Sequence, residues 1–227
     1  MKTTRSELIQ SLARDLHPVR PPLSPLLAAA CWLAGTWVFV VSVTLLIAPL
    51  RPGALLQAST HGRFLAESLV GLAGSVLIAG YVFADSVPGF ARRVVLPVGL
   101  ALAVVWVLAF VAGLGFPALE PSMVGKRAEC YLETLVYGLP PTLAAIWISR
   151  RYFVLEPLRT AALSALAAGM VPALLMQFAC MYDPAHILMF HILPVPLLVA
   201  VAVGVQWLLL RASSSRRDHR SSTAAGS

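Results

Sequence analysis

The chain has 227 residues, of which 59% are hydrophobic and only 12% are charged, and its mean hydropathy is +0.82. Soluble domains are usually about 45–50% apolar, so this composition excludes an ordinary soluble domain and indicates a membrane protein. The formal net charge of +7 would suit a nucleic-acid binder, but the positions of the basic residues favour another explanation.

The first 25 residues are predicted to form a short cytoplasmic helix and a proline-rich spacer. Thr4 and Glu7 have the spacing of a capping box, which marks the start of a helix, and four prolines between residues 18 and 25 end it. Such a short helix is marginal in water, so it needs either the inner leaflet or a partner protein to lie on. Few basic residues and a stiff spacer favour a soluble partner. The apolar stripe that would contact this partner consists of Leu8, Ile9, Leu12 and Leu16.

Residues 26–210 are predicted to be an all-α transmembrane domain, a bundle of six helices. Each of six apolar runs is close to the roughly 20 residues that a helix needs to cross a bilayer core of about 30 Å. Strands are excluded because the runs are continuous and isolated strands would leave backbone groups unpaired in lipid. The runs are Leu26–Pro49, Phe64–Ala84, Val94–Leu114, Cys130–Ser149, Leu158–Ala179 and His186–Leu210.

The basic residues predict the orientation of this bundle. If the N-terminus is cytoplasmic, 13 of the 17 Lys and Arg residues lie on the cytoplasmic side and the other 4 lie outside. The positive-inside rule then places both termini in the cytoplasm. Basic charge is explained by topology, and no direct contact with nucleic acid is expected. The arginine- and serine-rich tail, residues 211–227, is predicted to be disordered.

Two of the three cysteines are predicted to meet at the outer membrane face. Cys130 begins the fourth run and Cys180 ends the fifth, whereas Cys31 lies near the inner face. In an oxidising compartment two thiols at one depth can form a disulfide. Carboxylates and imidazoles accompany them, and with thiolates these are the donors that bind zinc, copper or cadmium. The candidate metal ligands are Cys130, Glu133, Cys180, Asp183, His186 and His191.

Each of these residues also has a purely structural explanation. Cysteines at a membrane edge are often inert, and Glu133 and Asp183 suit the positive ends of helix dipoles. The histidines can be interfacial, although His191 lies deeper than an interfacial side chain requires. Their co-location favours a site, since almost all the ionisable residues of two outer segments converge with both outer thiols.

Three further classes of function compete with a sensor. A membrane thiol oxidoreductase would generally have a CxxC motif and a second cysteine pair, and the sequence has neither. A metal transporter would carry ionisable residues near the middle of several spans and often an inverted repeat, and neither is evident. A purely structural or assembly role stays open.

The chain resembles the NrsF-like anti-sigma factors, negative regulators of extracytoplasmic-function sigma factors. The resemblance rests on "LIQSLARDLHPVRP" before the first run, "CYLETLVYGLPP" opening the fourth, and "DPAH" followed by "FHILP" at the fifth-to-sixth turn. It departs from the expected pattern at Phe190, where we expect tryptophan before the final histidine.

The resemblance implies a regulator of the bacterial inner membrane, not an enzyme, that requires no cofactor. In such a protein the cytoplasmic segment, residues 4–20 here, holds the sigma factor inactive. Cys130 and Cys180 match the two periplasmic cysteines that the response to metal or oxidant stress needs. We therefore expect an outer sensory site whose occupation or oxidation shifts the helix packing and alters how the N-terminal helix meets the sigma factor.

Overall fold

The computed structural model describes the chain except residues 1–8, 11–22, 153 and 225–227, and its side chains are described as far as Ala212. The described residues are almost entirely helical, which confirms the predicted all-α class. The helices are α2 (Pro25–Ile47), α3 (Ala54–Thr60), α4 (Gly62–Asp85), α5 (Val95–Gly113), α6 (Cys130–Ser149), α7 (Pro157–Ala179), α8 (Pro184–His186), the π-helix η1 (Ile187–Ile192) and α9 (Pro194–Ala224).

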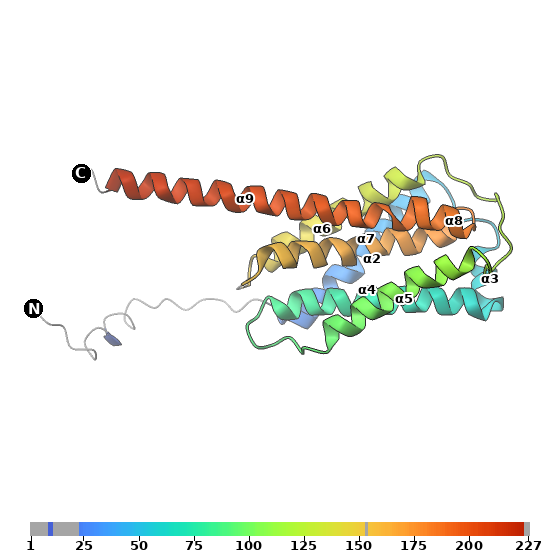
Figure 1. Cartoon of the computed structure of the whole chain (residues 1–227), viewed down its shortest axis with the longest axis horizontal. Helices are drawn as coiled ribbons and strands as arrows, with labels where there is room; N and C mark the ends of the chain where they lie inside the picture. Colours follow the sequence, from blue (N-terminus) through green and yellow to red (C-terminus); the bar gives the residue numbers. More distant parts are fainter. Residues whose placement is uncertain (1–8, 11–22, 153, 225–227) are drawn as a thin grey trace, which may run out of the picture.

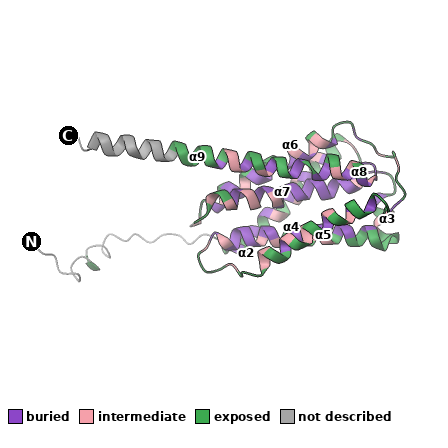
Figure 2. Ribbon diagram, viewed as in Figure 1, coloured by how far each residue is buried: buried purple, intermediate pink, exposed green. Residues whose placement is uncertain are grey.

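The long helices lie side by side in one elongated bundle, with α7 at its centre (Figure 1). Helix α7 packs against α2, α4, α6 and α9, and 78% of its most apolar window is buried, compared with 17% for α5. Figure 2 shows the same contrast between α7 and α5. A bundle of this kind needs small residues where helices approach closely. A Cβ added at Gly138 of α6 would lie 3.5 Å from the Cα atom of Gly169 in α7.

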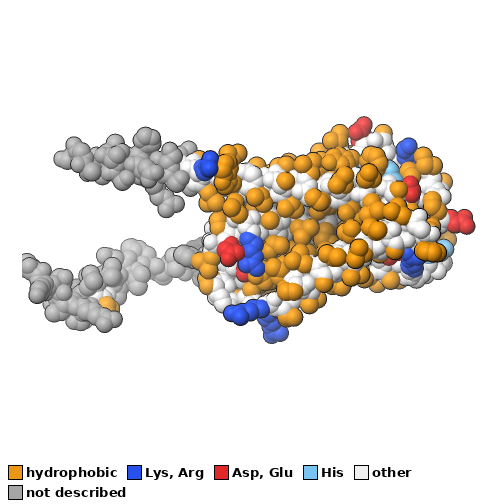
Figure 3. All heavy atoms as spheres, viewed as in Figure 1, with side chains coloured by type: hydrophobic (Ala, Val, Ile, Leu, Met, Phe, Trp, Pro, Cys, Tyr) orange, Lys and Arg blue, Asp and Glu red, His pale blue; other side chains and the backbone are white. Residues whose placement is uncertain are grey.

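The bundle has the surface of a membrane protein. Hydrophobic side chains cover the middle of the face shown in Figure 3, and charged side chains gather towards its two ends. Five helical segments are long and apolar enough to cross a membrane: Pro25–Ile47, Gly62–Asp85, Val95–Gly113, Pro157–Ala179 and Pro184–Ala212. Helix α6, predicted as another span, has 20 residues, but its polar residues and two prolines keep it outside this group.

The structure describes the predicted N-terminal segment and the predicted C-terminal tail to different extents. Leu8, Leu12 and Leu16 lie outside the described residues, and Ile9 is helical and 57% exposed. Where the sequence predicted a disordered tail from residue 211, α9 instead continues as a helix to Ala224. The physical reason is that the segment contains neither proline nor glycine before Gly226, while its arginines and alanines favour helix.

Candidate functional site: two thiols and two imidazoles

The two outer cysteines meet, as the predicted topology requires. Cys130 is the first residue of α6 and Cys180 follows the last residue of α7, and their Sγ atoms lie 2.9 Å apart. Both residues are buried, and both are free thiols in the structure. Cys31 is an exposed residue near the other end of the bundle, at the start of α2. The structure thus brings Cys130 and Cys180 together at one end of the bundle and places Cys31 apart from them.

A short fixed linker positions the residues that follow Cys180. The backbone N–H of Ser122 donates to the carbonyl of Tyr182 at 2.9 Å, and the N–H of Ala118 donates to the Tyr182 hydroxyl at 3.1 Å. The Tyr182 side chain is buried and its ring packs edge-on against Phe64. The loop between α5 and α6 therefore holds the linker between α7 and α8 in place.

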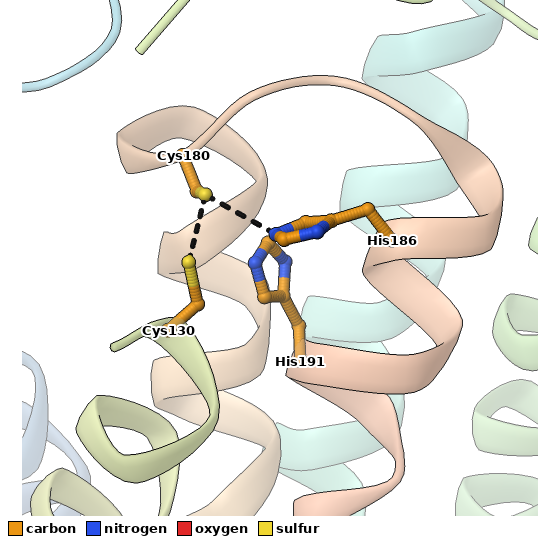
Figure 4. Close-up of side chains that lie close together, drawn as sticks. All are labelled: Cys130, Cys180, His186 and His191. Atoms are coloured by element: carbon orange, nitrogen blue, oxygen red, sulfur yellow. Dashed lines mark hydrogen bonds between the residues drawn. The ribbon is translucent and has the colours of Figure 1, made fainter. Parts of the chain in front are cut away.

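A π-helix brings both histidines to the thiols. His186 ends α8 and His191 lies in η1, and their rings meet edge to face with centroids 5.1 Å apart (Figure 4). Residues five apart point in different directions from an α-helix, but the wider turn of a π-helix aligns them. The π turn is recorded by the hydrogen bond from the Leu193 N–H to the Leu188 carbonyl at 3.0 Å. Pro194 follows and has no N–H to offer the α-helical pattern.

Four ligand atoms result, from Cys130, Cys180, His186 and His191, all within 4.8 Å of one another. The Nε2 atom of His186 lies 3.4 Å from Sγ of Cys180. His191 is fully buried, and neither of its ring nitrogens has a hydrogen-bond partner. A buried imidazole without partners is costly, and a metal ion would satisfy it. Two sulfurs and two imidazole nitrogens are a donor set for tetrahedral zinc and for softer ions such as cadmium or copper(I).

The two predicted carboxylate ligands lie elsewhere. Oε2 of Glu133 accepts a hydrogen bond from Nη1 of Arg127 at 2.8 Å, in an ion pair whose side chains are 12% and 6% exposed. Oδ1 of Asp183 accepts from the backbone N–H of Ala185 at 3.2 Å and so caps α8. The structure therefore brings together four of the six candidate ligands and gives the carboxylates structural partners.

The chemistry around Cys180 favours a thiolate. A hydrogen bond with the Cys130 thiol lowers the pKa of Cys180, burial opposes this shift, and the hydrogen bond with the His186 imidazole lowers the pKa further. A thiolate is the form of cysteine that binds metals and reacts with oxidants. The lowered pKa of Cys180 therefore favours its binding to a soft ion.

Sequence reasoning missed two buried arginines beside the site. Arg127 is 7% exposed and Arg51 is 4% exposed, and the Arg51 guanidinium lies 5.8 Å from the centroid of the Tyr182 ring. Burial lowers the pKa of Arg51. The sequence offers one signal for these two arginines: the predicted outer side holds only 4 basic residues, so each of them is unusual there. Topology alone explains this small number but not the burial of the two side chains.

Comparisons with known proteins place the chain in a family. A family model described as "Negative regulator of sigma F" (NrsF) matches residues 12–211. The chain is 30% identical over 205 residues to the carotenogenesis protein CarR of Myxococcus xanthus, across 90% of this chain and 84% of that protein. No solved structure matches the chain significantly. These matches confirm the resemblance predicted from the sequence: the chain belongs to the NrsF family of negative regulators of sigma F.

Proposed function

We propose that this protein is an inner-membrane anti-sigma factor that sequesters an extracytoplasmic-function sigma factor through its N-terminal cytoplasmic segment. Family membership supports a sigma factor as the partner. The partner would bind the apolar stripe of the N-terminal helix, in the manner of a helix in a groove. Ile9, the one residue of this stripe that the structure describes, is 57% exposed and thus available for such a contact.

In this proposal six helices, α6 included, cross the bilayer and both termini are cytoplasmic. The start of α2 and the end of α9 lie at the same end of the bundle (Figure 1), as an even number of spans requires. Two arginines at that end stack on tryptophans: Arg151 lies 4.2 Å from the ring centroid of Trp147, and Arg211 lies 3.7 Å from that of Trp207. Such aromatic and basic anchors are typical of a membrane interface, and the basic excess favours the cytoplasmic one.

The Cys130–Cys180 pair is the sensory site of this proposal. A thiophilic ion such as zinc, copper or cadmium would bind the two sulfurs and the imidazoles of His186 and His191. Alternatively, an oxidant would accept two electrons and join the two sulfurs in a disulfide, and the remaining thiol proton of the pair would be released. The observation that carries the proposal is the convergence of four ligand atoms around a buried, unpartnered His191.

The two events differ in the free energy that they can supply to switch a regulator. Converting a two-state protein from mostly inactive to mostly active needs a difference of about 5.5 kcal/mol between the states. A structural zinc site supplies about 10–16 kcal/mol and a disulfide about 2–4 kcal/mol. The free energy of metal binding therefore exceeds the requirement, whereas that of a disulfide falls short of it by at least about 1.5 kcal/mol and would shift the equilibrium only in part.

A reporter driven by the cognate sigma factor tests this proposal in cells. We expect Cd²⁺ or an oxidant to induce the reporter in the wild type and to have no effect in the double variant Cys130→Ser, Cys180→Ser. Cys31→Ser is the matched control and should be induced normally. Removal of residues 1–20 should abolish co-purification of the sigma factor and leave the reporter permanently active. Normal induction in the double variant would refute the sensory role, and sigma binding without residues 1–20 would refute the binding segment.

A further inference from the structure

Arg127 is the point at which three helices are tied together at the outer end of the bundle. Its Nε atom donates to the carbonyl of Ala179 at the end of α7, at 3.2 Å, and its Nη1 atom donates to Glu133 in α6. Its Nη2 atom faces carbonyls at the end of α2 and just beyond. These acceptors are Ala48 at 2.6 Å, Pro49 at 3.2 Å and Thr44 at 3.3 Å.

This arrangement matches a cation to the negative ends of two helices. The last carbonyls of a helix lack intrahelical partners and carry the negative end of the helix dipole. The buried guanidinium contacts the Thr44 carbonyl of α2, which also accepts the N–H of Ala48, the two carbonyls just beyond α2, and the last carbonyl of α7. The position of the end of α2 relative to α7 therefore depends on where the Arg127 side chain lies.

The same residue contacts the thiol pair from both sides. The single proton of the Cys130 thiol is shared between the carbonyl oxygen of Arg127 at 3.2 Å and Sγ of Cys180 at 2.9 Å. The Ala179 carbonyl that Arg127 binds immediately precedes Cys180. When Cys130 loses its proton to a metal or to a disulfide, this donor disappears. An unprotonated sulfur then faces a carbonyl oxygen, which is unfavourable, so the backbone at Arg127 must move.

Helix α2 is well suited to respond to such a movement. It is the helix that continues from the N-terminal segment, and only 22% of its most apolar window is buried, compared with 78% for α7. Among the described residues, a second polar contact of α2 with the bundle is the hydrogen bond from Trp32 Nε1 to the Pro141 carbonyl at 2.9 Å. The remaining contacts of α2 with α4, α6 and α7 are mainly apolar, so Arg127 supplies much of the polar attachment at its end.

We propose that Arg127 is the positioning residue that couples the state of the Cys130–Cys180 pair to α2, and through α2 to the N-terminal segment. In the resting state the guanidinium holds the end of α2, and the segment retains the sigma factor. Engagement of Cys130 displaces Arg127, α2 is released, and the sigma factor dissociates. This inference rests on the proposed function and adds the route by which the signal leaves the site.

The test is an epistasis experiment with a binding control. In the full-length chain, Arg127→Gln should give a permanently active reporter, because α2 is no longer held. The reporter should stay active when Cys130→Ser and Cys180→Ser are added, since Arg127 acts after the thiols. Arg127→Lys, which keeps the charge but loses the fork of donors, should raise the uninduced reporter only in part. The control Lys126→Gln removes the exposed cation next to Arg127 in the sequence, and it should behave as the wild type.

Binding of Cd²⁺ to the purified variants distinguishes coupling from damage to the fold. Arg127→Gln and Arg127→Lys should keep the thiolate–Cd²⁺ absorption band with an affinity within about threefold of the wild type. Wild-type regulation in Arg127→Gln would overturn the inference, and so would loss of the Cd²⁺ band in both variants, which would indicate structural damage. If instead the wild type fails to bind a sigma factor, or Cys130→Ser, Cys180→Ser remains inducible, it is the proposed function that fails.

Discussion

The two ends of the bundle, the predicted outer end and the predicted inner end, are held together in different ways. At the end that carries the thiol pair, the predicted outer end, the Arg127–Glu133 ion pair is 6% and 12% exposed, and every nitrogen of the guanidinium has an acceptor. At the opposite end Arg159 forms a pair with Glu156 in which the side chains are 39% and 62% exposed. The end with the thiol pair therefore fixes the positions of its polar groups, as a ligand site needs, whereas the Arg159–Glu156 pair at the opposite end remains partly exposed.

The largest contrast is expected between the cysteines of the two ends. Cys180→Ser should weaken Cd²⁺ binding by about 100- to 1000-fold, because the roughly 10–16 kcal/mol of a structural metal site is divided among four ligands. Cys31→Ser should leave the affinity unchanged. Competition titration of the purified protein against a chelator of known affinity measures both values. Equal affinities in the two variants would show that Cys180 is not a ligand.

The ion pairs should differ in their contribution to stability. Glu133→Ala leaves Nη1 of the buried Arg127 unpaired and should cost about 2–3 kcal/mol, below the 3–5 kcal/mol of a fully buried pair because the site lies near the outer face. Glu156→Ala should change stability by less than about 0.5 kcal/mol, since exposed pairs contribute little. Denaturant unfolding in detergent measures the difference. Similar losses in the two variants would mean that the two ends are not distinct.

His191→Leu should change stability and metal affinity in opposite directions. Without metal, the variant removes two unsatisfied buried nitrogens and should gain about 1 kcal/mol. With metal, it removes a ligand and should bind Cd²⁺ at least about tenfold more weakly. Thermal unfolding with and without Cd²⁺ reports both effects. A loss of stability without metal would indicate that His191 has a structural partner in the resting protein.

The smallest expected difference in stability is between the variants of two tyrosines. Tyr182→Phe removes the buried acceptor of the Ala118 N–H and should cost about 1 kcal/mol, with a severalfold loss of Cd²⁺ affinity as the linker loosens. Tyr152→Phe removes an exposed hydrogen bond to the Leu23 carbonyl, which water replaces, so only a few tenths of a kcal/mol are expected. The same unfolding and titration assays apply. A larger loss of stability in Tyr152→Phe than in Tyr182→Phe would contradict this prediction.

The parts of the fold that the bilayer dictates could be predicted from the sequence. Apolar runs give the spans because a membrane requires about 20 apolar residues, and alternating loops then bring Cys130 and Cys180 to one face. The tail after residue 211 was assigned to disorder from its composition, although nothing in it stops a helix before Gly226. Composition alone therefore predicted disorder in a segment that the structure describes as helical.

The finer geometry of the site depends on tertiary contacts that no local pattern records. His186 and His191 are five residues apart, and only the π-helix makes both of them face Cys180. The three-residue spacing from Cys130 predicts Glu133 as a metal ligand, but its carboxylate instead pairs with Arg127 of the preceding loop. The role of Arg127 depends on carbonyls that lie 78–83 residues away in the chain. Such long-range contacts have no signature in a single sequence.

The central claim is that occupation of the outer thiol–imidazole site releases the sigma factor at the inner end. Its most direct test is a titration of Cd²⁺ into the purified complex of the full-length protein and its sigma factor in lipid nanodiscs. We predict that the sigma factor dissociates at about one equivalent of Cd²⁺ and that the complex with Cys130→Ser, Cys180→Ser remains intact. A wild-type complex that binds Cd²⁺ at these sulfurs and still retains the sigma factor would contradict the account.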